Sequence, residues 1–257
     1  MKKLATALCL TSALMACSSA QATAIWHSSG NWLVGLSGGL THDRSELNVT
    51  TSSTLNASPF GLRQTVVSPR FQDDGWFLGL LAGYQWRCNR WLLGIEGNLD
   101  WYDNGGGNND FAYTDANNRG WSATSDYDRD WVLGLSGRLG YGVTDWLMAY
   151  GRVGLEYSDD ELNYTQFLNN AAPFNVSASE SQDSLRAFAG LGVEMPLPIS
   201  NWNCLSIRAE YDYHDKGRRV EATGVSTSAA STEWASASFK PYTQTIFLSL
   251  VYNFVTK

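Results

Sequence analysis

A stripe of alternating residues recurs eight times along this chain, and it restricts the fold more than any other feature. In the segment RWLLGIEGNLDWY, residues 90–102, one parity is mostly apolar while the other carries Glu96, Asn98 and Asp100. A period of two residues is that of a β-strand with one apolar and one polar face. Trp91 and Trp101 stand at the ends of the apolar row, as in strands whose outer face meets lipid and whose ends meet the headgroup layers. The stripe therefore predicts the strands of a membrane-spanning barrel.

Eight such strands make an even number, as a closed antiparallel bacterial barrel requires. No continuous apolar run after residue 22 reaches the length of about 18 residues that a membrane-spanning helix needs. We therefore predict an all-β fold, a single eight-stranded antiparallel transmembrane β-barrel. The predicted strands are Asn31–Thr41, Gly75–Arg87, Arg90–Tyr102, Arg129–Val143, Asp145–Ser158, Ser184–Pro196, Cys204–His214 and Pro241–Phe254.

The connections between these strands alternate between short and long. Tight turns are expected at Cys88-Asn89 and Val143-Thr144, with a somewhat longer turn after Pro196, and they should face the periplasm together with both termini. The long connections are rich in Ser, Thr, Asn, Asp and Gly, so we expect extracellular loops. They are Asp43–Asp74, Asp103–Asp128, Asp159–Asp183 and Asp215–Lys240.

Large aromatic residues interrupt these polar segments. They serve either as anchors for an external partner or as packing groups that order the loops and extend the strands above the membrane. The residues concerned are Phe60, Phe71, Phe111, Tyr113, Trp121, Phe167, Phe174 and Trp234.

The first residues have the composition of a secretory signal. Two lysines precede an apolar run and then small residues, and Ala20-Gln21-Ala22 is a suitable cleavage site. We expect residues 1–22 to be the signal peptide and residues 23–257 to be the outer-membrane β-barrel domain. A lipoprotein signal ending at Cys17 is a less favoured alternative, because Met15 fits that pattern poorly.

The chain is acidic, with a formal net charge of −7. Without Lys2 and Lys3 it has 16 basic against 25 acidic residues. Such a surface argues against nucleic acid as a partner. The oligomeric state is not set by the sequence, and a monomer is favoured.

The inward parity of the strands collects charges of both signs. Opposite charges on adjacent strands can pair, as Glu96 and Arg138 are predicted to do. An eight-stranded barrel is about wide enough inside for its own side chains, whereas aqueous channels belong to barrels of roughly 16 strands or more. We therefore predict a filled lumen, with a narrow porin-like channel for small solutes as the second hypothesis. The predicted ion-pair network comprises Arg87, Glu96, Asp100, Arg138, Arg152, Glu156, Arg186, Glu194, Arg208, Glu210 and Asp212.

Two cysteines remain after the signal region, Cys88 and Cys204. Both fall at the short-turn end of the predicted strands, both are assigned to the inward parity, and an exported pair permits a disulfide. A bridge across the periplasmic mouth and two separate thiols are equally open, since a bridge needs α-carbons within about 7 Å.

Four stretches carry a family resemblance: GYQWRCNRWLLGIEGNLDWYD (83–103), GRLGYGVTDWLMAYGRVGLEY (137–157), GLGVEMPL followed by SIRAEYDYHD (190–215), and LSLVYNF (248–254). With them the chain resembles the small outer-membrane β-barrel proteins called outer-membrane immunogenic or surface-antigen proteins, which share the architecture of the OmpA barrel. The resemblance covers nearly all of the mature chain outside the long loops. It implies a bacterial outer-membrane location and a structural, antigenic or adhesive role, with no common catalytic activity, cofactor or site residues. The chain departs from the family in the cysteine pair and in the three residues that follow Phe254.

Signals for chemistry are weak. A lipid-modifying enzyme would need a His with an acidic residue or Ser near the outer rim; His42 beside Asp43 and His214 beside Asp215 are instead expected to be solvated rim residues. The segment Asp126–Asp130 lacks the Gly and Glu of a calcium loop. We therefore expect no catalysis, no cofactor and no metal.

The remaining expectations concern partners. They are outer-membrane lipids, lipopolysaccharide, and an extracellular ligand or host surface at the loops, in a role in envelope integrity or adhesion. Lys216, Arg218 and Arg219 form a basic spot that either contacts lipopolysaccharide phosphates or is solvated.

Overall fold

The computed structural model describes residues 30–58, 61–103, 109–169, 175–198, 204–228 and 231–254. Within these ranges every regular element is a β-strand, and no helix is long and apolar enough to cross a membrane. The predicted signal peptide, His27, Phe60, Phe174 and residues 255–257 lie outside the described ranges.

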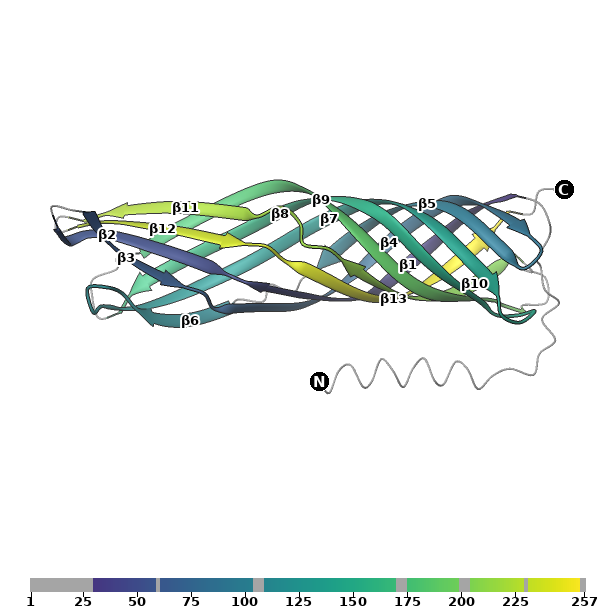
Figure 1. Cartoon of the computed structure of the whole chain (residues 1–257), viewed down its shortest axis with the longest axis horizontal. Helices are drawn as coiled ribbons and strands as arrows, with labels where there is room; N and C mark the ends of the chain where they lie inside the picture. The colour runs from purple at the N-terminus through teal and green to yellow at the C-terminus, as the bar shows by residue number, and fades with distance from the viewer. Residues whose placement is uncertain are drawn as a thin grey trace.

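Eight strands close into one antiparallel ring (Figure 1). Every neighbouring pair, including the closing pairs β1–β13 and β5–β7, is joined by a hydrogen-bonded ladder, so the predicted eight-stranded barrel is confirmed. In ring order the strands are β1 (Asn31–Glu46), β4 (Arg70–Cys88), β5 (Trp91–Asp103), β7 (Gly120–Gly142), β8 (Met148–Leu168), β9 (Asn175–Pro196), β10 (Leu205–His214) and β13 (Tyr242–Asn253).

Short connections join these strands at one end of the barrel. Between β4 and β5, Cys88 pairs with Trp91 across a two-residue turn. Asn89 in this turn has a φ of 55°, a left-handed conformation that Asn tolerates better than most residues. The described chain ends lie at the same end, where the Phe254 amide donates to the Trp32 carbonyl.

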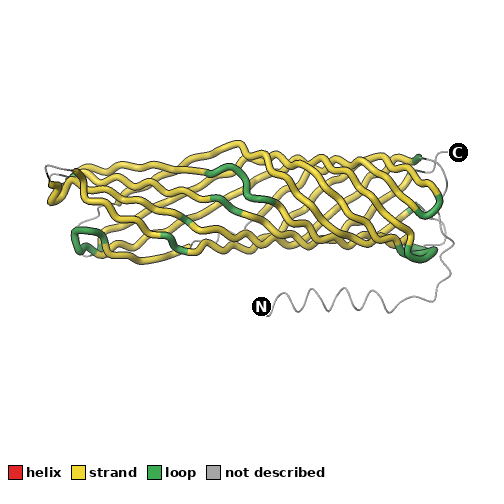
Figure 2. Tube along the Cα trace, viewed as in Figure 1, coloured by secondary structure: helices red, strands yellow, loops and turns green. Residues whose placement is uncertain are grey.

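The long connections are strands rather than loops, so that part of the prediction is wrong. The ring strands continue past the predicted ends, and β8 reaches Leu168 where we expected an end at Ser158. A second sheet, in the order β11-β12-β2-β3, stands above the ring, and Figure 2 shows strand along most of the long axis. We call this part, with β6 and the adjoining ends of β7, β8 and β9, the distal half, and the part at the short turns the proximal half. Its added strands are β2 (Asn48–Ser58), β3 (Gly61–Val67), β6 (Asn109–Thr114), β11 (Val220–Thr227) and β12 (Thr232–Phe239).

The proximal half has an apolar outer face bounded by aromatic rings. On β4 the exposed row runs from Trp76 to Trp86, and on β5 it runs from Trp91 to Trp101. Ten residues of a tilted strand span ~25 Å, the height of the apolar band of an outer-membrane barrel. The predicted lipid-facing rows are therefore on the outside, while the charged parity points into the lumen.

The distal half has the opposite chemistry. Its outer rows are polar, and its interior is an apolar cluster in which aromatic side chains from β4, β7, β8 and β12 face small ones from β9, β11 and β12. Phe71 contacts Tyr127 and Phe239 edge to face, while Ala178, Ala222 and Ala235 supply the small partners. Large residues against small ones let a narrow barrel fill its interior without voids.

A bulge in β7 lies at the boundary between the halves. The β7–β8 register shifts between Arg129 and Val132, and both Asp130 and Trp131 are exposed. An extra residue unpaired on one strand changes which parity faces inward beyond it. The bulge thus lets Tyr127 and Arg129 point inward above the boundary and Val132 point inward below it.

Candidate functional site

The lumen of the proximal half holds a buried square of four charged side chains. Glu96 from β5 and Glu194 from β9 are each bound by Arg138 from β7 and Arg208 from β10. The predicted Glu96–Arg138 pair is confirmed at 2.5 Å between Oε1 and Nη1. Two negative and two positive charges leave the square neutral, which is what makes burial of all four tolerable.

Aromatic rings and a second ion pair extend this square along the axis. The Arg138 guanidinium carbon lies 3.9 Å from the ring centre of Tyr150, and the Tyr150 hydroxyl donates to Glu210. Arg152 binds Glu210 at 2.6 Å and reaches Asp212 at 3.6 Å. Charge-assisted hydrogen bonds and cation–π contacts of this kind fix side chains in one arrangement.

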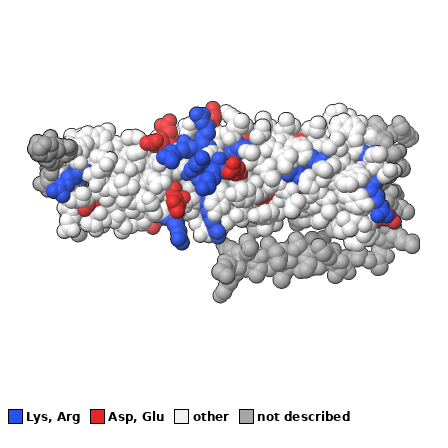
Figure 3. All heavy atoms as spheres, viewed as in Figure 1, with Lys and Arg blue, Asp and Glu red and all other residues white. Residues whose placement is uncertain are grey.

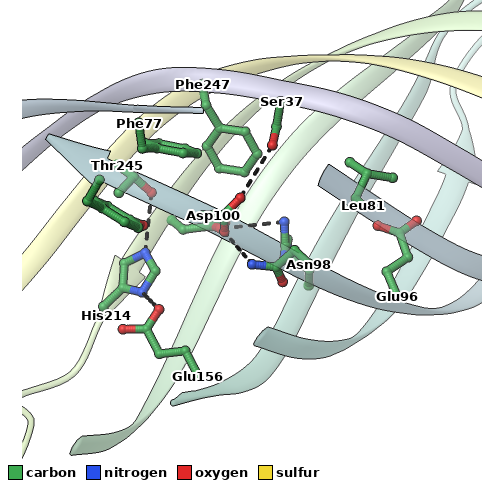
Figure 4. A pocket seen from close by; sticks show the side chains of 13 residues that line it. Ser37, Phe77, Leu81, Glu96, Asn98, Asp100, Glu156, His214, Thr245 and Phe247 are labelled. Carbon is green, nitrogen blue, oxygen red and sulfur yellow. Dashed lines mark hydrogen bonds and ion pairs between the residues drawn. The ribbon is translucent and has the colours of Figure 1, made fainter. Parts of the chain in front are cut away.

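The middle of the lumen contains a small polar cavity, shown in Figure 4. His214 Nδ1 lies 2.7 Å from Glu156, and its Nε2 lies 3.3 Å from Thr245. On the opposite wall Asp100 accepts hydrogen bonds from Ser37 and Asn98. The cavity volume is about 20 Å³, little more than one water molecule occupies, so the lumen is filled at this level.

A third cluster closes the top of the proximal half. Asp160 on β8 is bound by Arg129 and Arg186 and accepts a hydrogen bond from the Tyr127 hydroxyl at 2.8 Å. Arg129 is 1 % exposed and Asp160 is 0 % exposed. The apolar core of the distal half begins directly above them with Tyr127 and Phe71.

The structure thus brings nearly all the predicted network residues into interacting groups. Arg186 joins Asp160 rather than another predicted residue, and Arg87 at the short-turn end donates to the Met148 sulfur at 3.5 Å. Prediction missed Arg129, Asp160, Tyr150 and His214. Asp160 could have been found from the sequence, because it continues the row of alternate polar residues on β8 that begins with Glu156 and Ser158.

A separate group of charged side chains lies at the distal tip of the barrel, in the turn between β6 and β7. Arg119 binds Asp115 at 2.6 Å and Glu233 at 2.9 Å, and the Trp121 indole donates to Asp115 at 3.0 Å. Burial by itself raises the pKa of Asp115, but hydrogen bonds from the Arg119 amide, Trp121 and the Arg119 side chain outweigh it and leave that pKa lowered. Asp115 is therefore ionised here, and the tip is tied across β7 and β12 by charge.

Comparison with known proteins agrees with this architecture. The model of the outer membrane protein beta-barrel domain matches residues 9–254. The chain belongs to this family. It is therefore a β-barrel of the bacterial outer membrane, in contact with membrane lipids, and the distal half is extracellular.

Solved structures with similar barrels have low identity to this outer-membrane barrel. The attachment invasion locus protein Ail of Yersinia pestis is 11% identical with a TM-score of 0.29, covering 82% of this chain and 97% of its own. Neisserial surface protein A is 12% identical, with a TM-score of 0.35 and coverage of 84% and 97%. OprG of Pseudomonas aeruginosa is 17% identical, with a TM-score of 0.38 and coverage of 88% and 97%. No curated protein matches the chain.

The two cysteines in the described part of this outer-membrane barrel, Cys88 and Cys204, are free thiols, so the disulfide alternative is wrong for this structure. Cys88 ends β4 and Cys204 precedes β10, and two strands, β1 and β13, stand between β4 and β10 in the ring. Cys88 is exposed and shares the outward parity of Trp86, which corrects its predicted inward placement. Cys204 is partly buried.

The histidines also differ from the prediction. His214 is 4 % exposed and belongs to the lumen, not to a solvated rim. His42 bonds Asp74 rather than its neighbour Asp43. Ser206, which lies on β10 near the short-turn end, donates to Glu194 at 2.8 Å.

The segment Asp126–Asp130 lies within strand β7 rather than in a loop. Its carboxylates at 126, 128 and 130 point outward, because Tyr127 and Arg129 are buried. Within the described ranges, no group of three or more His, Cys, Asp or Glu side chains is arranged to hold a metal ion.

The aromatic residues in the segments that were predicted to be loops divide into two sets. Phe71 and Trp121 are buried, and Phe111 and Tyr113 pack against the distal core, so these four order the strands. Trp234 is half-buried, and Phe167 is exposed. Packing is therefore the role of four of the six that lie in the described ranges.

Proposed function

We propose that this outer-membrane barrel is a closed surface protein without catalysis, whose distal half makes contact with a partner outside the cell. The observation that carries the proposal is the distal half itself, a tall, strand-built structure with its own apolar core standing on a charge-filled base. A rigid scaffold that projects residues beyond a membrane is suited to recognition. A filled lumen gives the strands below it an anchoring role.

The side chains best placed for this contact are apolar groups on the outer face of the distal strands. Leu62 and Val66 on β3, Phe167 on β8 and Val225 on β11 are each between 47% and 66% exposed. They stand among Ser, Thr and Asn side chains, well above the lipid-facing band. Exposed apolar residues of this kind are typical anchors of protein interfaces.

The experiment compares bacteria that carry wild-type protein with bacteria that carry Leu62→Ser, Val66→Ser, Phe167→Ser and Val225→Ser together. Adhesion is scored on cultured epithelial monolayers and on surfaces coated with matrix glycoproteins, and envelope leakage is scored by vancomycin sensitivity. The matched control is Val143→Ser, which removes an exposed valine at the periplasmic end.

We expect the fourfold variant to lower adhesion at least fivefold, with leakage and surface abundance unchanged. The control should behave as wild type. Unchanged adhesion in the variant would reject the contact surface. Altered leakage with unchanged adhesion would favour a role in envelope integrity.

A further inference from the structure

A belt of charged side chains encircles the barrel just above the lipid-facing band. Figure 3 shows Lys and Arg side chains gathered near the middle of the long axis, between two ends that carry few charges. On β1 the outward row passes from Leu40 to Arg44, and on the neighbouring β4 it passes from Trp76 to Arg70. Four to six residues of tilted strand correspond to ~10 to 15 Å along the axis, so the belt lies at the headgroups and just beyond them.

The charges in this belt are segregated by strand. The outward positions on β7, β8 and β9 carry carboxylates, such as Asp128, Asp159 and Asp183, and every arginine on these three strands is buried. Arg44, Arg70 and Lys240 occupy the other side of the ring, on or beside β1, β4 and β13, which are consecutive neighbours. Lys216, Arg218 and Arg219 follow β10 and reach the edge of β9, where the Asp215 amide donates to the Ala187 carbonyl and the Arg218 amide donates to Ser184. We call them the basic arc. The basic arc consists of Arg44, Arg70, Lys216, Arg218, Arg219 and Lys240.

All six side chains of the basic arc are exposed. Among the described residues none of them forms an ion pair, although the lumen arginines Arg138, Arg152, Arg186 and Arg208 do. Exposed carboxylates at Glu46, Asp74, Asp215 and Glu221 accompany them, but Asp74 is bonded to His42 and Glu221 to Ser236. The arc therefore keeps an excess of positive charge that its own chain does not use.

Three members of the arc converge on one place. Arg70 pairs in register with Glu46, two residues from Arg44. The Lys240 amide donates to Ser45, between those two positions. Arg44, Arg70 and Lys240 are thus grouped around the distal end of β1, directly above the lipid-facing residues Leu40 and Trp76.

We propose that the basic arc binds the phosphate groups of the phosphorylated glycolipid in the outer leaflet, lipopolysaccharide, and so fixes such lipids to one side of the barrel. The ligand is a lipid rather than a soluble anion because the arc adjoins the apolar band, so one molecule can place acyl chains on Leu40 and Trp76 and its phosphates on the arginines. The exposed carboxylates Asp128, Asp159 and Asp183 repel phosphate. Direct binding is therefore expected at Arg44, Arg70 and Lys240, because β1 lies opposite β8 in the ring. This inference concerns the membrane-facing belt and does not depend on the proposed external contact.

The test titrates the full-length protein, folded in detergent micelles, with diphosphoryl lipid A and with the same lipid after removal of its phosphates. Native mass spectrometry counts bound lipids and gives their Kd. The variant combines Arg44→Gln, Arg70→Gln and Lys240→Gln. The matched control combines Arg63→Gln and Arg90→Gln, which remove exposed arginines at the extracellular tip and in the β4–β5 turn.

A basic residue near an anionic lipid surface contributes about fivefold in affinity, so the triple variant should bind diphosphoryl lipid A ~100-fold more weakly. The control should stay within threefold of wild type, and wild type should prefer the phosphorylated lipid. Equal affinity of wild type for the dephosphorylated lipid would overturn the proposal, and this measurement holds even if the triple variant fails to fold. A triple variant that folds, as judged by its heat-dependent gel migration, and binds as wild type would also overturn it. Displacement of lipid A by excess inorganic phosphate would assign the arc to soluble anions instead.

Discussion

Replacing Glu194 by Gln tests whether charge balance holds the proximal lumen together. Glu194 is 0 % exposed and accepts hydrogen bonds from Arg138 at 3.0 Å, Arg208 at 3.0 Å and Ser206 at 2.8 Å. Gln preserves the shape of the side chain but removes one negative charge from the square. Arg138 and Arg208 would then share Glu96 alone, leaving one buried positive charge without compensation.

The expected loss follows from that imbalance. Removing one partner of a buried ion pair typically costs about 3 to 5 kcal/mol in the free energy of unfolding, and Glu96 still neutralises half of the square. We therefore expect Glu194→Gln to lower the free energy of unfolding by about 3 kcal/mol. Adding Arg208→Gln restores neutrality and leaves the Glu96–Arg138 pair, so the double variant should lose less than the sum of the two single variants.

The assay is urea unfolding in lipid vesicles, followed by circular dichroism. Glu180→Gln is the control, because Glu180 lies on the same strand, β9, but is exposed; it should change stability by at most about 0.5 kcal/mol. A loss below about 1 kcal/mol for Glu194→Gln, or simple additivity in the double variant, would refute the argument that charge balance stabilises the lumen.

The remaining predictions concern the lumen, the wall and the tip. In planar bilayers the protein should pass no steady ion current, because the central cavity measures about 20 Å³; a steady current altered by Arg138→Gln or Arg152→Gln would establish a pore. Gly154→Ala should destabilise the barrel by about 1 to 3 kcal/mol, since its methyl would lie 2.4 Å from the Leu135 carbonyl, whereas Gly137→Ala on β7 meets nothing within 4 Å and should be neutral by the same urea assay. The lowered pKa of Asp115 means that its contribution to stability is complete above the ordinary Asp pKa of about 3.9 and is lost as the pH falls through its folded-state value. Hydrogen exchange, normalised for intrinsic rate, should show the β6–β7 turn losing protection between pH 5 and 3 in the wild-type protein, whereas protection in Asp115→Asn should not depend on pH. Unchanged protection of the wild-type turn over this pH range would contradict the assignment.

The proximal half could be predicted from the sequence because contact with lipid requires apolar side chains at every second position of each strand. Trp76, Trp86, Trp91 and Trp101 mark both ends of the band, and the charges opposite them required partners inside. From this follow the strand number, the outward rows and the Glu96–Arg138 pair. The distances in the square, and the choice of Asp160 as partner of Arg186, depend on strand stagger, which the pattern of a single strand does not contain.

The distal half was missed because its apolar side chains face inward and its polar side chains face outward, the reverse of the proximal half. Segments such as Val176-Ser177-Ala178-Ser179 and Ala235-Ser236-Ala237 also alternate, with Val or Ala inside and Ser outside. Small apolar residues give a weak hydropathy contrast, and the abundance of Ser, Thr and Asn is typical of loops. The buried aromatics Trp121 and Tyr127 were the stronger signal, since both share their parity with the small buried residues Ala123 and Ser125.

Strand β8 runs through both the proximal and the distal half, and its inward side chains limit what the protein can transport. On β8 the inward row begins with Met148 and Tyr150, carries charge at Arg152, Glu156 and Asp160, and then becomes apolar at Leu162 and Tyr164. Any solute moving along the axis would therefore meet a charge network and an apolar core in series. An ion would have to leave water to enter the apolar core, and an apolar molecule would have to displace paired charges, so each half opposes the class of solute that the other would admit. The arrangement favours a barrel whose activity lies on its outer surfaces, in the extracellular strands and the charged belt beneath them.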